Sequence, residues 1–339
     1  MGAGKRRATS RDVALRAGVS QSAVSRAFTR GGSISESTRR KVLHAASALN
    51  YVPNSIARSL ITARSNIVAM VVGDLHNPFY STVLDEFSQV LQAEGKHVLV
   101  FRVANGSEVD DALLEVLQFQ VDGIVVTSAQ VSSKMAGLCL DRGIPVVMFN
   151  RYVEGVRTDN VCCDNLSGGR RAAQALMRSG GSRFAMIIGE QQASTNRDRM
   201  EGFLACLAEA GVARKAVRIV PGDYTYEGAV AATRDLFSDP ATAPDAVFCS
   251  NDIMALGAMD TLAGELHLRV PEDVMLIGFD DIPEAGRAPY RLTTIRQPRD
   301  AMIEKTLELL DRDPGEPVAP TTHFFDGELV WRDSLREPG

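Results

Sequence analysis

The chain has 339 residues, of which 45% are hydrophobic and 23% are charged, which excludes long disordered, collagen-like and coiled-coil proteins. The length predicts two domains with room for a small third unit. The longest uninterrupted apolar run covers residues 67–72, far short of the ~20 residues that cross a bilayer. The first residues contain no apolar segment typical of a secretory signal, so we expect a cytoplasmic protein without a membrane partner.

The charge is unevenly distributed along the chain. The formal net charge is −5, yet residues 1–64 contain 12 lysines and arginines and only two acidic residues, a net charge of +10. The rest of the chain therefore carries −15. A basic segment joined to an acidic body is typical of a nucleic-acid-binding segment attached to a domain of another kind.

The basic segment has the pattern of a helix-turn-helix. Ser10 and Ser20 are predicted N-caps of two short helices, and Gly18 between them suits a left-handed turn. A third helix is predicted from near residue 35 to residue 49. In this motif the second helix enters the major groove of DNA. Its polar face carries side chains that can read base edges, namely Gln21, Ser22, Ser25 and Arg26.

The segments 11–26 and 49–60 resemble the DNA-binding head and hinge of the lactose-repressor (LacI/GalR) family. The resemblance implies a homodimer on a palindromic operator of double-stranded DNA. It implies DNA contacts at Ser10, Gln21, Ser22, Ser25, Arg26, Asn54, Ala57 and Leu60. Paired hinge helices would enter the minor groove, where Leu60 wedges a base step open.

From residue 65 onward, short apolar runs alternate with amphipathic stretches. The first runs lie at 67–72, 98–103, 123–127 and 145–149, and the rhythm restarts near residue 161. This alternation predicts parallel sheets covered by helices on both faces, arranged as two doubly wound α/β lobes. Ligands of such sheets bind at the carboxyl ends of the strands.

Polar and aromatic side chains follow these predicted strands, in segments 74–80, 150–151, 195–199, 222–224, 250–252 and 278–281. Amides, carboxylates and arginines beside aromatic rings suit a neutral ligand with many hydroxyl groups, such as a sugar. A purine or another flat molecule is the alternative, because Phe79 and Tyr80 could stack on it.

The family resemblance continues in segments 77–80, 199–203, 251–257, 278–281 and 292–298, which are similar to an effector domain like the periplasmic sugar-binding proteins. By position, Arg199 and Asp280 match the main ligand-binding pair. The resemblance implies further effector contacts at Phe79, Tyr80, Asn150, Tyr224 and Asn251. Several relatives have Asp where this chain has Asn150 and Trp or Phe where it has Tyr224, which leaves the identity of the effector open.

The resemblance also implies the domain organisation. The head would cover residues 1–50 and the hinge 51–64. The N-terminal effector lobe would combine 65–164 with 295–323, and the C-terminal lobe 165–294 with 324–339. The chain would thus cross between the lobes three times.

Other polar residues are predicted to have structural roles. Asp252 is expected to cap the following helix, and Asp281 is a second candidate for such a cap. Arg151 and Arg197 are expected to form surface ion pairs, and Gly168-Gly169 to allow a close approach of two helices.

Five cysteines and five histidines show no metal-ligand spacing, and no nucleophile or zinc-protease motif occurs, so we expect no metal, no cofactor and no enzymatic activity. The predicted function is a DNA-binding transcriptional repressor whose operator affinity depends on a small-molecule effector held between two lobes. The alternatives are the same regulator with a non-sugar effector and a solute-binding protein without a DNA role.

Overall fold

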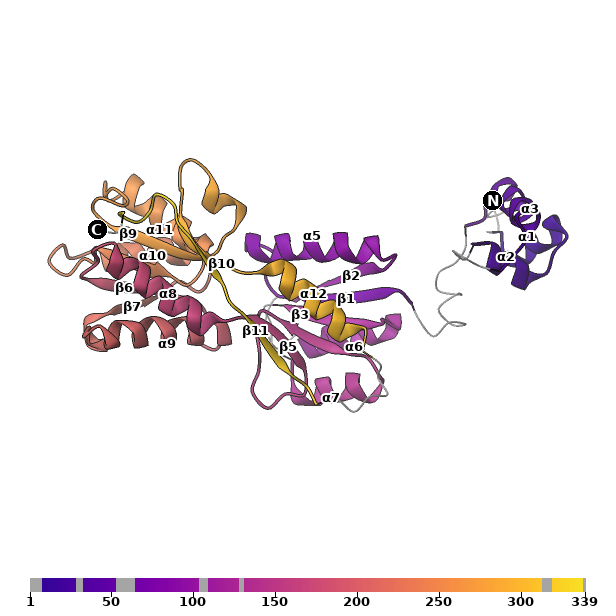
Figure 1. Cartoon of the computed structure of the whole chain (residues 1–339), viewed down its shortest axis with the longest axis horizontal. Helices are drawn as coiled ribbons and strands as arrows, with labels where there is room; N and C mark the ends of the chain where they lie inside the picture. Colours follow the sequence, from indigo (N-terminus) through magenta and orange to yellow (C-terminus); the bar gives the residue numbers. More distant parts are fainter. Residues whose placement is uncertain are drawn as a thin grey trace, which may run out of the picture. The chain divides into compact units, whose positions relative to one another are not determined.

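The structure is a computed structural model that describes residues 8–28, 33–52, 65–103, 109–127, 131–312 and 319–337. The chain divides into two compact units, Met1–Ser65 and Asn66–Gly339. Figure 1 shows both units, coloured by position in the sequence. The predicted hinge residues Asn54, Ala57 and Leu60 lie outside the described residues.

The first unit contains three helices, α1 (Ser10–Ala17), α2 (Gln21–Phe28) and α3 (Glu36–Ala48). They pack around Val13, Val24 and Val42, each at most 1% exposed. Gly18 has the predicted left-handed conformation, with φ of 65°. The expected N-cap was wrong by one residue, because the side chain of Thr9 accepts from the backbone N–H of Asp12, whose carboxylate accepts from the N–H of Thr9 in return. This reciprocal capping box makes Ser10 the first helical residue.

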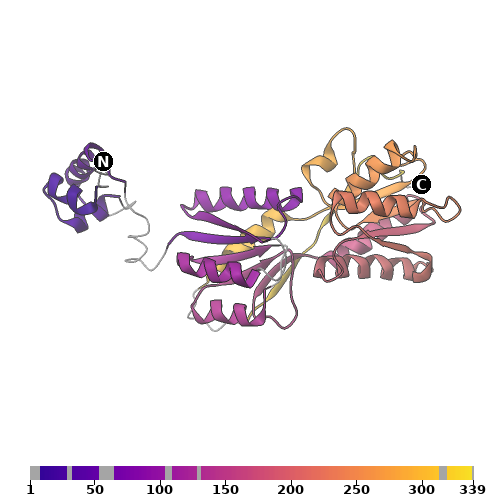
Figure 2. The same ribbon diagram turned by 180° about the vertical axis from the view of Figure 1, so that it is seen from behind.

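The first lobe of the second unit is built on a six-stranded parallel sheet in the order β11-β5-β4-β3-β1-β2. Its strands are β1 (Ile67–Val72), β2 (His97–Arg102), β3 (Gly123–Thr127), β4 (Val146–Phe149), β5 (Asp159–Cys163) and β11 (Thr322–Phe325). Helices α5 (Pro78–Ala93) and α12 (Arg299–Leu310) cover one face, and α6 (Val109–Val116) and α7 (Ser133–Asp141) cover the other (Figures 1 and 2). Alternate residues of β1 accordingly enter two separate cores.

The second lobe repeats this arrangement on a sheet in the order β12-β10-β9-β8-β6-β7, in which only the pairing of β10 with β12 is antiparallel. Its strands are β6 (Phe184–Ile188), β7 (Arg218–Pro221), β8 (Ala246–Cys249), β9 (Met275–Asp280), β10 (Thr293–Arg296) and β12 (Glu328–Val330). Its helices are α8 (Asn165–Arg178), α9 (Ser194–Glu209), α10 (Tyr226–Leu236) and α11 (Asp252–Gly264). Together the two units confirm the predicted fold class, a helical head and two doubly wound lobes.

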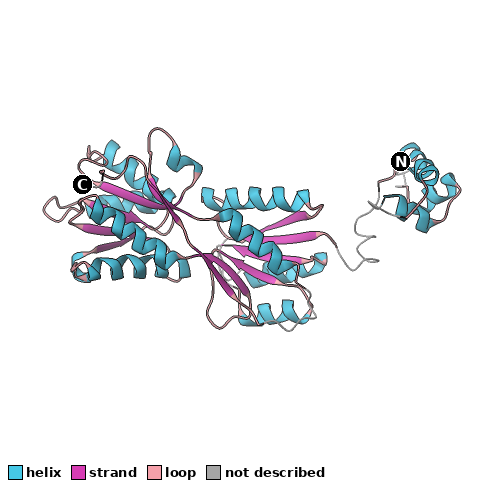
Figure 3. Cartoon of the chain, in the orientation of Figure 1, coloured by secondary structure: helices cyan, strands magenta, loops and turns pink. Residues whose placement is uncertain are grey.

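The chain passes between the two sheets near the places that the sequence suggests, but the strand pairings move two boundaries. All of β10 pairs with β9, so the crossing lies after Arg296 and not before residue 295. All of β11 pairs with β5, and β12 joins the second sheet, so the last crossing lies between Phe325 and Glu328. Figure 3 shows these strands where the chain runs from one lobe to the other. The hydrogen-bonded pairing of two strands extends for as many residues as their register allows. The sequence pattern does not show where this pairing ends.

Two glycines bring helices α8 and α9 into backbone contact. A Cβ atom on Gly169 would lie 2.1 Å from the carbonyl oxygen of Arg199, and one on Gly202 would lie 2.0 Å from that of Leu166. The predicted close helix approach at Gly168-Gly169 is therefore confirmed. The contact matters for the site described below because it fixes the backbone of Arg199.

We predict that Gly169→Ala and Gly202→Ala each destabilise the second unit by about 1–3 kcal/mol or more, because backbone atoms cannot move aside as a flexible side chain can. Thermal unfolding followed by circular dichroism measures this effect. Gly137→Ala in α7 is the matched control, since a Cβ atom there meets nothing within 4 Å. If the three variants unfold at the same temperature, the glycines are not required for the helix contact.

Candidate functional site: a cavity at the strand ends of two lobes

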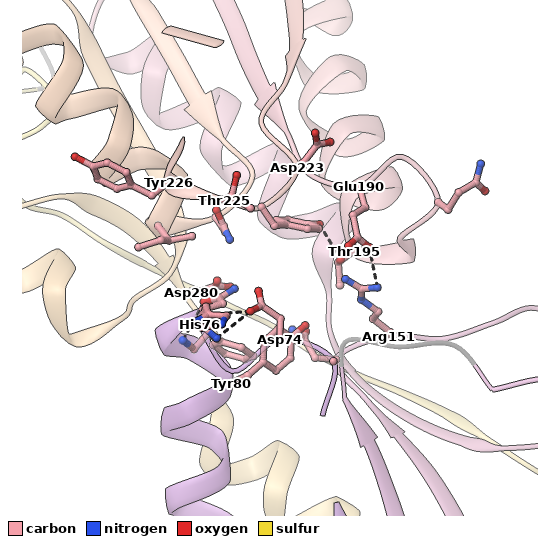
Figure 4. A pocket seen from close by; sticks show the side chains of 18 of the residues that line it. Asp74, His76, Tyr80, Arg151, Glu190, Thr195, Asp223, Thr225, Tyr226 and Asp280 are labelled. Carbon is pink, nitrogen blue, oxygen red and sulfur yellow. Dashed lines mark hydrogen bonds and ion pairs between the residues drawn. The ribbon is translucent and has the colours of Figure 1, made fainter. Parts of the chain in front are cut away.

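A cavity of about 770 Å³ lies at the carboxyl ends of the strands of both sheets (Figure 4). From the first lobe it is lined by residues that follow β1, β2 and β4, and from the second by residues that follow β6, β7, β8 and β9. This is the edge at which doubly wound sheets bind ligands. Its volume falls within the range of about 300–1,000 Å³ typical of small-molecule sites.

All seven residues predicted to contact an effector line this one cavity, although they come from both lobes and are spread over some 200 positions of the chain. They are Phe79, Tyr80, Asn150, Arg199, Tyr224, Asn251 and Asp280. Their placement together is an observation; that they bind an effector stays a prediction.

Arg199 is held by several contacts and is only 2% exposed. Its Nε donates to Asn165 Oδ1 at 2.8 Å, and its Nη1 donates to the carbonyl oxygen of Ser250. The guanidinium carbon lies 3.6 Å from the ring centroid of Phe279, a close cation–π contact. The rotamer is thus fixed before any ligand arrives, and Nη2 faces Asp280 Oδ1 at 3.5 Å.

Asp280 is buried beside this guanidinium. Burial raises the pKa of its carboxyl group to about 6, although Arg199 and the amide of Gln297 act to lower it. Gln297 Nε2 donates to Oδ1 at 2.7 Å. The backbone of Asp280 has a φ of 119°, a conformation that L-residues rarely adopt and that is found disproportionately at functional sites.

Aromatic residues line the cavity from both lobes, Phe79 and Tyr80 from the first and Tyr224 from the second. The rings of Phe79 and Tyr80 meet edge to face, with centroids 5.2 Å apart. Burial raises the pKa of Tyr80 to about 12, so its phenol stays protonated. The hydroxyl of Tyr224 lies 2.9 Å from that of Thr195, which also lines the cavity.

Three buried polar atoms of the cavity lining have no hydrogen-bond partner among the described residues. They are the side-chain oxygen of Asn150, the Nε of Arg151 and the side-chain nitrogen of Asn251. A buried polar group without a partner costs about 1–3 kcal/mol. A ligand with hydroxyl or other polar groups can supply the missing partners.

Several nearby residues lie in environments that differ from those their sequence context predicts. The sequence predicts Arg151 in a surface ion pair, but its side chain is buried, with 7% of the residue exposed, and it lines the cavity. Arg197 is exposed, as predicted.

The helix caps also differ from the prediction. Asn251 caps α11 by accepting from the N–H of Met254. The predicted cap Asp252 is fully buried and accepts from Thr294 and from the N–H of Ile282. Asp281 caps no helix and instead pairs with Arg296 and Arg332.

Four of the five DNA-contacting side chains predicted for the head lie on one helix, and the fifth, Ser10, lies on α1. Gln21, Ser22, Ser25 and Arg26 are exposed on α2. Gln21 Nε2 donates to the hydroxyl of Ser10 at 2.8 Å, so the two predicted contact residues are in fact neighbours. Arg39 on α3 donates to the carbonyl oxygen of Ala27 and ties the supporting helix to α2.

Within the described ranges, no group of three or more His, Cys, Asp or Glu side chains is placed to hold a metal ion. The helices in the same ranges include none long and apolar enough to span a membrane.

Comparison with known proteins identifies both units. Residues 9–54 match the family described as "Bacterial regulatory proteins, lacI family", and residues 173–335 match "Periplasmic binding protein-like domain". The "HTH-type transcriptional regulator CelR" of Thermobifida fusca is 33% identical, over 97% of this chain and 99% of its own. The "HTH-type transcriptional repressor CytR" of Escherichia coli (strain K12) is 32% identical, over 97% and 96%.

A solved structure, "transcriptional regulator CelR-cellobiose complex", has a TM-score of 0.70 and 31% identity, and the match covers 97% of this chain and 100% of that one. Both the sequence and the fold thus match over nearly their full lengths. The chain belongs to the lacI family of bacterial regulatory proteins and is a DNA-binding transcriptional regulator.

Proposed function

We propose that this protein is a homodimeric repressor that reads a palindromic operator with helix α2 and releases it when a sugar binds in the cavity of the second unit. The observation that carries the effector part is the convergence of buried polar atoms without partners on a cavity lined by both lobes. The hinge residues Asn54, Ala57 and Leu60 belong to this proposal as minor-groove contacts, on the family resemblance.

The arrangement of Phe79 and Tyr80 favours a sugar over a flat base. Their rings meet edge to face, with an interplanar angle of 80°. The two rings therefore do not form a pair of parallel faces between which a base could stack. Arg199 and Asp280, by contrast, offer a donor and an acceptor side by side, which suits adjacent hydroxyl groups. CelR, solved with cellobiose, supports a sugar of one or two rings in a cavity of this size.

We predict that Asp280→Asn and Arg199→Lys weaken sugar binding at least tenfold, because the first removes the charge of the acceptor and the second replaces a planar fork of donors with a single ammonium group. Isothermal titration with glucose, ribose, cellobiose and free nucleobases measures the affinities. Arg199 holds Asn165 and Ser250, so a lysine rather than an alanine is used and circular dichroism checks the fold. Unchanged affinities in both variants would show that the effector binds elsewhere.

The raised pKa of Asp280 predicts a pH dependence of sugar binding. A hydroxyl donates to the ionised carboxylate, so affinity is full above the pKa of about 6 and falls as the pH drops through it. At pH 5 the affinity should be about tenfold lower than at pH 7. The Asp280→Asn protein should lack this slope. A flat profile in the unmodified protein would contradict the assignment of Asp280 to the ligand.

For DNA, we predict that Gln21→Ala and Arg26→Ala each cost about 1–3 kcal/mol on the specific operator and much less on random DNA, because base-edge contacts are lost while phosphate contacts remain. The operator is first selected from random duplexes, and affinities are then measured by fluorescence anisotropy at several salt concentrations. Equal losses on both kinds of DNA would assign these side chains to the phosphate backbone instead.

A further inference from the structure

Arg151 is a buried guanidinium whose hydrogen-bonding groups are only partly used. It follows β4 in the first lobe and its side chain is 9% exposed. Nη1 lies 3.2 Å from Glu190 Oε2 of the second lobe, and Figure 4 shows this contact beside the cavity. Its Nε is buried without a partner. The cavity thus contains a second fork of donors in addition to Arg199.

The two buried guanidiniums of the cavity differ in their counterions. Arg199 faces the buried carboxylate of Asp280, whereas the half-buried carboxylate of Asp74, which also lines the cavity, accepts from the backbone N–H groups of His76 and Asn77. Asp252 lies behind the lining and is occupied by Thr294 and Ile282. The carboxylates of Asp223 and Glu227 and the guanidinium of Arg102 are exposed at the cavity, where water screens them.

Glu190 is a weak counterion for Arg151. Its side chain is 56% exposed, whereas that of Arg151 is 9% exposed. An ion pair with one well-solvated partner contributes little, and among the described residues Arg151 pairs with no other carboxylate. A ligand group inside the cavity can therefore compete with Glu190 for the guanidinium.

We propose that the effector is a sugar derivative with one anionic group, a carboxylate or a phosphate, and that Arg151 is the residue that selects this group. The anion accepts from the unpartnered Nε and from Nη2, the two nitrogens on one edge of the guanidinium, in a fork geometry that matches either group, and it competes with the charge of Glu190 on Nη1. The hydroxyl groups remain with Arg199, Asp280 and Asn150. This inference rests on the proposed effector function of the cavity and adds the charge of the ligand to it.

The test compares matched ligands on the full-length protein. Thermal shift and isothermal titration are run with D-gluconate and D-glucose 6-phosphate as anionic probes and with D-glucose and D-cellobiose as neutral ones. We expect at least one anionic probe to bind ten or more times tighter than the neutral probes. Preference for gluconate identifies a carboxylate, and preference for glucose 6-phosphate identifies a phosphate.

Three variants then test whether Arg151 binds the anionic group of the ligand. Arg151→Gln should lose at least tenfold in affinity for the anionic probe, and Glu190→Gln should gain severalfold, because the competing carboxylate is gone. Arg234→Gln is the matched control, since Arg234 forms an exposed pair with Glu265 and does not line the cavity. Glu190→Gln also serves if the Arg151 variant fails to fold, because it leaves the guanidinium in place.

Three results overturn the inference: no anionic probe binds, Glu190→Gln weakens anion binding, or a neutral sugar binds tightly to the unmodified and Arg151→Gln proteins alike. In the last case, if Asp280→Asn still abolishes binding of that neutral sugar, the proposed effector function stands and only the charge of the ligand is wrong. If Asp280→Asn leaves every ligand unaffected, the effector function of the cavity fails as well.

Discussion

The site depends on the burial of one guanidinium, that of Arg199. A charge removed from water must be paired and hydrogen-bonded, and the partners of this one come from three elements: Asn165 on α8, the carbonyl oxygen of Ser250 after β8, and Asp280 at the end of β9. These partners fix the carboxyl edge of the second sheet around the cavity. Helix α9 can bring Arg199 there because Gly169 and Gly202 let its backbone touch that of α8.

The sequence predicts the two lobes and most of the cavity lining, because parallel strands expose their carboxyl ends at one edge and the residues there are easily read. It fails where a side chain's environment is set by distant parts of the chain. Asn251 and Asp252 both suit an N-cap, and only the contact of Asp252 with Thr294 separates their roles. Arg151 resembles any surface arginine until the loop after β4 is folded against the second lobe.

This loop, residues 150–154, both lines the cavity and ties the lobes together. The backbone N–H of Tyr152 donates to the hydroxyl of Ser194, and its phenol donates to the carboxylate of Asp198 at 3.0 Å. Arg197 lies over the Tyr152 ring, 5.6 Å from its centroid. The same loop presents Asn150 and Arg151 to the cavity. A ligand that binds these two residues therefore acts on the segment that holds one lobe to the other.

Ligand binding and the arrangement of the two lobes are coupled through a free energy that can be measured. A ligand shifts an equilibrium only by the difference in its affinity for the two states. That difference comes from the ligand's contacts to both lobes, set against the contacts that hold the lobes together, among them those of Arg151 with Glu190 and of Tyr152 with Ser194. Typical couplings are about 1–3 kcal/mol and are reciprocal. Operator DNA must therefore change the affinity for the effector by the same factor by which the effector changes the affinity for operator. Either measurement gives the same coupling free energy between the two sites.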